Sequence, residues 1–242
     1  MGPILHLTLR QLATRWRLVV ISFLALLPTV LAAIGSELGS GGQSYEKDFV
    51  NTVVDGLLVG GIVPIVTMVL ATTAFGHELE DRTLSYLMLR PLPRWQIALP
   101  KFLASIAVGG PLLVASGVVA TVLGLDLGLR AASAVAFATL AGVVTYAAIF
   151  TWAGLLSSRA LAFALVYVFL WEGLLSTFLG GVRYLSVRAY TLAIMSGIDE
   201  DGFGDVLGGR VIELPAALAG AAVVSPVFFW LTVRRLRRMD VP

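Results

Sequence analysis

Glu172 is the one charged residue that lies well inside a long apolar stretch of this 242-residue sequence, in the run Tyr-Val-Phe-Leu-Trp-Glu-Gly. A charge at the centre of a bilayer costs about 2.5–3.5 kcal/mol on insertion scales, so such residues usually face other protein groups or a water-filled path. Glu172 could therefore contact a substrate, or it could be a protonated, hydrogen-bonded clamp between helices. Its neighbours Tyr167 and Trp171 belong either to a cavity wall or to an aromatic belt at the membrane surface.

A second group of acids lies in the segment from Asp199 to Asp205. Gly202, Gly204 and Asp205 match the Gly-x-Gly-Asp motif of intramembrane aspartyl proteases, but that chemistry needs two carboxylates that share a proton. No Tyr-Asp partner occurs in another apolar stretch. A calcium loop would need a regular ladder of Asp residues and a closing Glu, which the spacing lacks. We expect a solvated turn.

The sequence lacks the residues that thiol chemistry, a zinc-protease site or a phosphate-binding loop would need. The chain has no cysteine and only two histidines, His6 and His77, which do not form an H-E-x-x-H pair. No phosphate-binding G-x-x-x-x-G-K-[ST] loop occurs either, because the only lysines, Lys47 and Lys101, follow Glu46 and Pro100. We expect no cofactor bound by this chain. The net charge of +2 is too small to predict a nucleic-acid partner.

The elements that position these residues are predicted from long apolar windows. The chain is 58% hydrophobic and 13% charged, and its charges gather between stretches of about the 20 residues that a membrane-spanning helix needs. Alternation typical of barrel strands is absent. We therefore predict an all-α integral membrane protein, a single transmembrane domain over residues 1–242. Its six expected spans are 18–36, 53–75, 102–124, 132–156, 161–180 and 214–233.

The longest polar interruption between two of these spans is Gly76–Lys101, which we call the coupling segment. Within it, Thr83 to Leu89 has the pattern of a short amphipathic helix. Asp81 precedes that helix, where a carboxylate suits its N-terminal dipole, and Pro91 ends it. A short, charged helix with a fixed end is a poor lipid anchor and favours contact with a soluble protein.

Three shorter features complete the pattern. Residues 3–16 place Ile4 or Leu5, Leu9, Leu12 and Trp16 on one side, which favours an amphipathic helix in the membrane interface no more than a frayed start with chance spacing. Residues 39–48 are expected to form a loop, and 184–195 are apolar enough to fold back as a short re-entrant or interfacial helix. The small-xxx-small spacing of residues 56–60 permits close helix approach.

Lysine and arginine counts predict the orientation. The loops on one side of the six-span layout, together with both termini, hold twelve of these residues, and the other loops hold five. Both termini and the coupling segment are therefore expected to be cytoplasmic, in the plasma membrane.

The coupling segment also carries a family resemblance. Its run Glu80, Thr83, Leu87, Arg90-Pro91, Arg94, Ile97 and Lys101 resembles the first cytoplasmic loop of ABC-2-type transporter permeases, in which a coupling helix docks on a separate ATPase subunit. The resemblance implies a permease that works with a second permease copy and two ATPases, with ATP and Mg²⁺ held by the ATPases. The implied coupling residues are Glu78, Glu80, Asp81, Arg82, Thr83, Arg90, Pro91, Arg94 and Lys101.

The same resemblance implies a path for the substrate. In this family the second and fifth spans line the central cavity, which places near it Thr67, Thr72, Tyr167, Trp171 and Glu172. The implied function is export of a substrate with ATP hydrolysed by the partner. Two other hypotheses stay open: an intramembrane enzyme that uses Glu172 or Asp205, and a non-catalytic membrane scaffold subunit.

The predicted topology can be tested with single cysteines, because the chain has none of its own. On intact cells, cysteines replacing Ser40 and Gly208 should react with a membrane-impermeant thiol reagent, and one replacing Ser85 should not. Labelling at Ser85 from outside would contradict the orientation.

Overall fold

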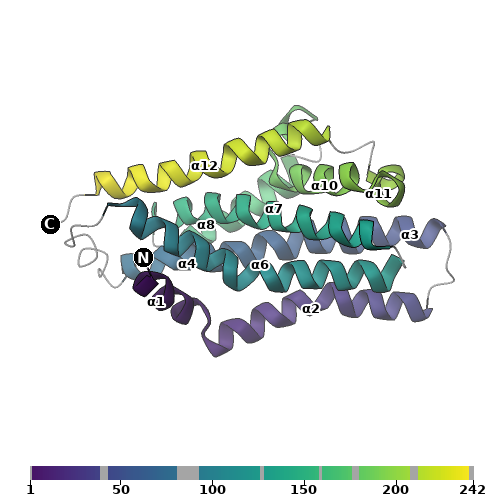
Figure 1. Cartoon of the computed structure of the whole chain (residues 1–242), viewed down its shortest axis with the longest axis horizontal. Coiled ribbons are helices and arrows are strands. Elements are labelled where there is room, and N and C mark those ends of the chain that lie inside the picture. The colour runs from purple at the N-terminus through teal and green to yellow at the C-terminus, as the bar shows by residue number, and fades with distance from the viewer. Residues whose placement is uncertain are drawn as a thin grey trace.

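Apolar residues recur along almost the whole chain without the alternation of strands, and the chain accordingly folds into helices (Figure 1). The computed structural model describes residues 2–38, 43–80, 93–125, 128–157, 160–175, 180–207 and 212–239. Within these ranges every regular element is helical, which confirms an all-α membrane protein.

Five helices of the described residues are long and apolar enough to cross a membrane. They are α2 (Arg15–Leu38), the continuous helix made of α3 (Gln43–Phe49), η1 (Val50–Ile62) and α4 (Val63–Glu80), then α6 (Trp95–Leu125), α7 (Leu129–Gly154) and α12 (Leu214–Arg238). They cover the first, second, third, fourth and sixth predicted spans. Helices α6 and α7 begin before their predicted bounds, because Lys101 and Arg130, which border charge-free windows in the sequence, lie inside helices.

The fifth predicted span, 161–180, is described in part. The chain forms α8 (Ala160–Val166) and the π-helical η2 (Tyr167–Leu175), and it resumes with the short 3₁₀ helix η3 (Gly180–Leu185). Two further short helices follow, α10 (Val187–Ile198) and α11 (Glu200–Leu207).

The bundle is elongated, and the start of α1 and the end of α12 lie at one end of it, the terminal end (Figure 1). The opposite end, which we call the far end, holds α3 and α11. The centre is α7, which is buried along most of its length and contacts α4, α6, α10 and α12. By contrast, α2 and α12 expose most of their surface and form the outer sides, as expected of lipid-facing helices.

The N-terminal helix predicted for residues 3–16 exists in shorter form. Helix α1 (Gly2–Leu12) packs against α6 and buries Thr8 and Leu12. The chain then turns before α2 begins, so Trp16 does not share a face with Leu12 and is 79% exposed, contrary to the predicted spacing. The expected loop 39–48 is likewise wrong for its second half, because α3 begins at Gln43 and the Tyr45 and Phe49 rings lie 6.0 Å apart on it.

The close contact between the end of α7 and α4 depends on a glycine. A methyl group at Gly154, the last residue of α7, would lie 2.8 Å from the backbone oxygen of Thr72 on α4 and 3.1 Å from its Cα. Backbone atoms cannot move aside as a side chain can, so only glycine permits this crossing.

We expect Gly154→Ala to lower the free energy of unfolding by about 1–3 kcal/mol, because overpacking a close contact forces backbone shifts. Gly76→Ala is the matched control, since a methyl group there has open space. That change should leave stability equal or raise it by up to about 1 kcal/mol, as replacing a helical glycine does. Thermal unfolding of both variants in detergent measures the difference, and equal stabilities would contradict the close crossing.

Candidate functional site

The short helix α10 is enclosed by the bundle although it is too short to cross a membrane. Nine of its residues are buried, and it packs against α7, α12 and η1. A helix here agrees with the prediction for residues 184–195, although it begins later. Ser186 is its N-cap, and the Ser186 hydroxyl accepts a hydrogen bond from the N–H of Ala189 at 3.1 Å.

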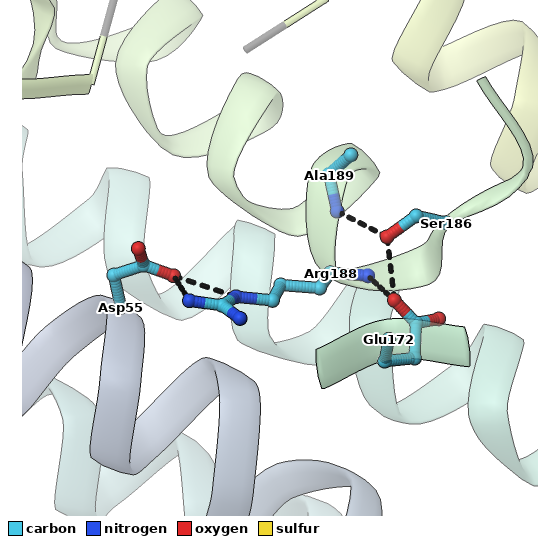
Figure 2. Close-up of polar contacts among 5 residues, drawn as sticks. All are labelled: Asp55, Glu172, Ser186, Arg188 and Ala189. Atoms are coloured by element: carbon cyan, nitrogen blue, oxygen red, sulfur yellow. Dashed lines mark hydrogen bonds and ion pairs between the residues drawn. The ribbon is translucent and has the colours of Figure 1, made fainter. Parts of the chain in front are cut away.

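Glu172 lies at the N-terminus of α10 (Figure 2). Its carboxylate accepts hydrogen bonds from the Ser186 hydroxyl, from the Val187 N–H at 2.9 Å and, more weakly, from the Arg188 N–H at 3.4 Å. The residue is 1% exposed. These donors lie at the positive end of the α10 dipole and engage both carboxyl oxygens. The geometry is therefore that of a clamp that joins η2 to α10.

A second acid holds α10 from the other side. Arg188 donates from Nε to Asp55 Oδ1 at 2.8 Å, and its Nη2 lies 2.7 Å from the same oxygen (Figure 2). Asp55 is buried on η1. Gly60 makes room for the guanidinium, since a methyl group there would lie 3.3 Å from Arg188 Cζ. The small-xxx-small spacing of residues 56–60 thus places one of its glycines against an arginine side chain.

Both acids lie in π-helical segments, Asp55 in η1 and Glu172 in η2. Such segments are rare and occur often at functional sites. The first one ends just before Pro64, whose ring nitrogen has no N–H and cannot continue its ladder of hydrogen bonds. The π-helical segments η1 and η2 therefore carry the two carboxylates that hold α10.

The C-terminus of α10 is held at the far end by Arg130, at the start of α7. Its Nε donates to the Ile198 carbonyl at 3.1 Å, and the guanidinium lies 3.9 Å from Asp199 and 3.5 Å from Asp201. A base at this end complements the helix dipole, as Glu172 does at the other. Arg130 is largely exposed, so this anchor is the weaker one.

The solvated turn expected for residues 199–205 is wrong. The segment forms α11, which buries Phe203 and Leu207 one turn apart. Asp205 is exposed on α11, beyond the C-terminus of α10, whereas Glu172 lies at the N-terminus of that helix. A 12-residue helix is about 18 Å long, so these two carboxylates do not share a proton.

The substrate-path candidates form two groups. Tyr167, Trp171 and Glu172 are together: the two rings stack with centroids 6.4 Å apart, the Tyr167 hydroxyl is 3.4 Å from Glu172, and the Trp171 Nε1 is 3.4 Å from the Leu185 carbonyl. Thr67 and Thr72 are buried on α4, where the Thr72 hydroxyl donates to the Met68 carbonyl of its own helix. Their place on a substrate path stays a prediction.

Three of the predicted coupling residues have described side chains. Glu78 and Lys101 are both buried and pair with each other at 2.6 Å. Arg94 is half-buried, and its carbonyl accepts the N–H groups of Ile97 and Ala98 where α6 begins. Glu80 ends α4. The remaining predicted coupling residues lie outside the described residues: Asp81, Arg82, Thr83, Arg90 and Pro91, together with the expected short helix 83–89.

Sequence reasoning missed Asp55 and Arg188 as partners. It treats Asp55 as the border of an apolar window and Arg188 as a charge in a loop. One signal was available: Asp55 falls near the start of the second predicted span, 53–75, and an ionisable residue within a span usually has a partner.

The comparison with known families supplies the context for this site. Residues 13–184 match the model of a family described as "ABC-2 family transporter protein". No curated protein matches the sequence. The matched range includes Asp55, Glu172 and the coupling segment, and it ends just before Ser186 and Arg188.

The anchoring of α10 can be tested by comparing one substitution at two sites. Asp55→Asn leaves Arg188 with a neutral partner in a largely buried position and should lower the free energy of unfolding by about 3 kcal/mol. Asp201→Asn affects the exposed pair with Arg130 and should change it by less than about 1 kcal/mol. Thermal unfolding with hydrogen exchange of α10 measures both, and equal effects would contradict the anchoring role of Asp55.

Proposed function

We propose that this chain, which belongs to the ABC-2 family of transporter proteins, is a membrane subunit that exports a substrate with ATP hydrolysed on a separate ATPase subunit. The observation that carries the proposal is the family match over residues 13–184, more than half of the chain. The five spanning helices supply the multi-pass membrane body that such a subunit needs.

A six-span topology with cytoplasmic termini belongs to this proposal. The start of α1 and the end of α12 both lie at the terminal end (Figure 1), and a chain that returns to the side where it began crosses an even number of times. Five helices alone would leave the termini on opposite sides. The crossing formed around α8 and η2 is therefore the proposed additional span, and the excess of basic residues favours the cytoplasm for the terminal end.

The proposed mechanism is mechanical. The coupling segment docks on the ATPase, and closure of the ATPases moves the packed helices of two permease copies as rigid bodies. Helix α7 contacts α4, α6, α10 and α12, so displacement of α4 and α6 is carried to both outer and inner helices. In this scheme Thr67, Thr72, Tyr167, Trp171 and Glu172 lie along or beside the substrate path, and Glu172 holds α10 in place.

The enzyme hypothesis has less support. Of the carboxylates it could use, Glu172 is occupied by donors from the N-terminus of α10, and Asp205 is exposed on α11. The scaffold hypothesis would be favoured by a purified complex without an ATPase.

Coupling can be tested by reversing two charges of the segment. The double variant Glu80→Arg with Arg90→Glu should insert and express normally, but it should lose ATPase co-purification or separate ATP hydrolysis from transport. Removing one partner of a desolvated charge pair commonly costs about 2–5 kcal/mol of binding.

The matched control is Glu46→Lys with Lys47→Glu, an exposed acid and base on α3 at the far end. It should leave the ATPase bound. If the Glu80 and Arg90 reversal also leaves association and hydrolysis intact, the coupling assignment is wrong.

A further inference from the structure

Lys101 is one of the largest fully buried side chains of the protein, with 1% of its surface exposed. A buried ammonium group is expensive unless it is paired and hydrogen-bonded. The chain contains one other lysine, Lys47, which is exposed on α3. Burial of Lys101 therefore requires partners that replace the water around its ammonium group.

The partners of Lys101 all come from the last turns of α4. Its Nζ donates to Glu78 Oε1 at 2.6 Å and to the Ala74 carbonyl, and it lies 4.7 Å from the centroid of the Phe75 ring. A carboxylate, a carbonyl and the face of an aromatic ring together replace the water that the ammonium group loses. Lys101 thus joins the start of α6 to the end of α4.

This contact closes the base of the coupling segment. Glu78 and Lys101 are its third and last residues, and the chain between them leaves α4 and returns into α6. The ion pair therefore fixes how far apart the two ends of the intervening segment lie.

A separate apolar cluster extends this base to two further helices. The cluster contains Phe75 of α4, Ile97 and Ala98 of α6, Leu155 at the end of α7, and Val233 and Leu236 near the end of α12. Through Phe75, the ion pair therefore adjoins an apolar cluster to which the ends of four helices contribute.

We propose that the Glu78–Lys101 pair is the positioning element through which the coupling segment moves the terminal ends of α7 and α12. The inference rests on the proposed function, because it assigns these residues a role in passing on the motion of the ATPase. Glu78 and Lys101 act from inside the chain and do not form the docking surface itself. An apolar pair would fill the same space without fixing the helix ends so specifically.

The test compares Lys101→Met with Lys47→Met in the complex co-purified with its ATPase. Hydrogen exchange is measured with and without ATP and vanadate. In the unmodified complex, nucleotide should change exchange in the last turns of α4 and α12. Lys101→Met should keep the ATPase bound and hydrolysing ATP while the nucleotide-dependent change in α12 is lost. Lys47→Met should behave as the unmodified complex.

A second variant separates loss of the positioning role from misfolding caused by an unpaired buried charge. Glu78→Leu with Lys101→Met removes both charges, so it leaves no unpaired charge buried. It should assemble and still lose the nucleotide-dependent change in α12. If either variant shows the same change as the unmodified complex, the positioning role is wrong and the proposed function stands. If no ATPase co-purifies with the unmodified chain, the proposed function fails, and this inference fails with it.

Discussion

The need to satisfy the ionisable groups that the described helices bury, by ion pairs or hydrogen bonds, governs this structure. The second membrane-spanning helix carries two buried acids, Asp55 near the far end and Glu78 near the terminal end, and each has a basic partner from another element. The acids are 23 positions apart, which corresponds to about 34 Å along an α-helix, slightly more than the roughly 30 Å thickness of the hydrocarbon core. One helix is thus held ionically near both of its ends.

These ion pairs fix the relative positions of the helices more than they stabilise the folded protein. Desolvation offsets much of the attraction between buried charges, and well-packed apolar side chains can be as stabilising. An ion pair nevertheless fixes which atoms meet, whereas apolar helix faces tolerate sliding. Arg188 illustrates this, because its side chain binds η1 while its backbone N–H contacts Glu172 on η2, so α10 is set against two elements at once.

The sequence predicts helices better than it predicts their partners. Five spans follow from apolar windows, since length and composition decide whether a segment can cross a bilayer. Predicting helix ends from charge-free windows fails where a charged residue is paired inside the bundle. Lys101 is an example, because it lies within α6 and pairs with Glu78. The acidic 199–205 segment was readable as a helix from the one-turn spacing of Phe203 and Leu207, but its charges and glycines favoured a turn. Pairing of Asp55 with Arg188 joins residues 133 positions apart, and neither local pattern nor charge count names such a partner.

The family match ends at residue 184, just before α10, which supplies part of the site. Asp55 and Glu172 lie inside the matched range, and the groups that satisfy them, the Arg188 guanidinium and the N-terminus of α10, lie beyond it. Without the segment after residue 184, both carboxylates would face an apolar interior without those donors, and each would be costly to bury. The matched part of the membrane body therefore needs α10 to complete its polar interior, and α10 needs those two acids to be held inside the bundle. Each depends on the other for a stable position, which makes α10 a part of the transporter body and not a separate appendage.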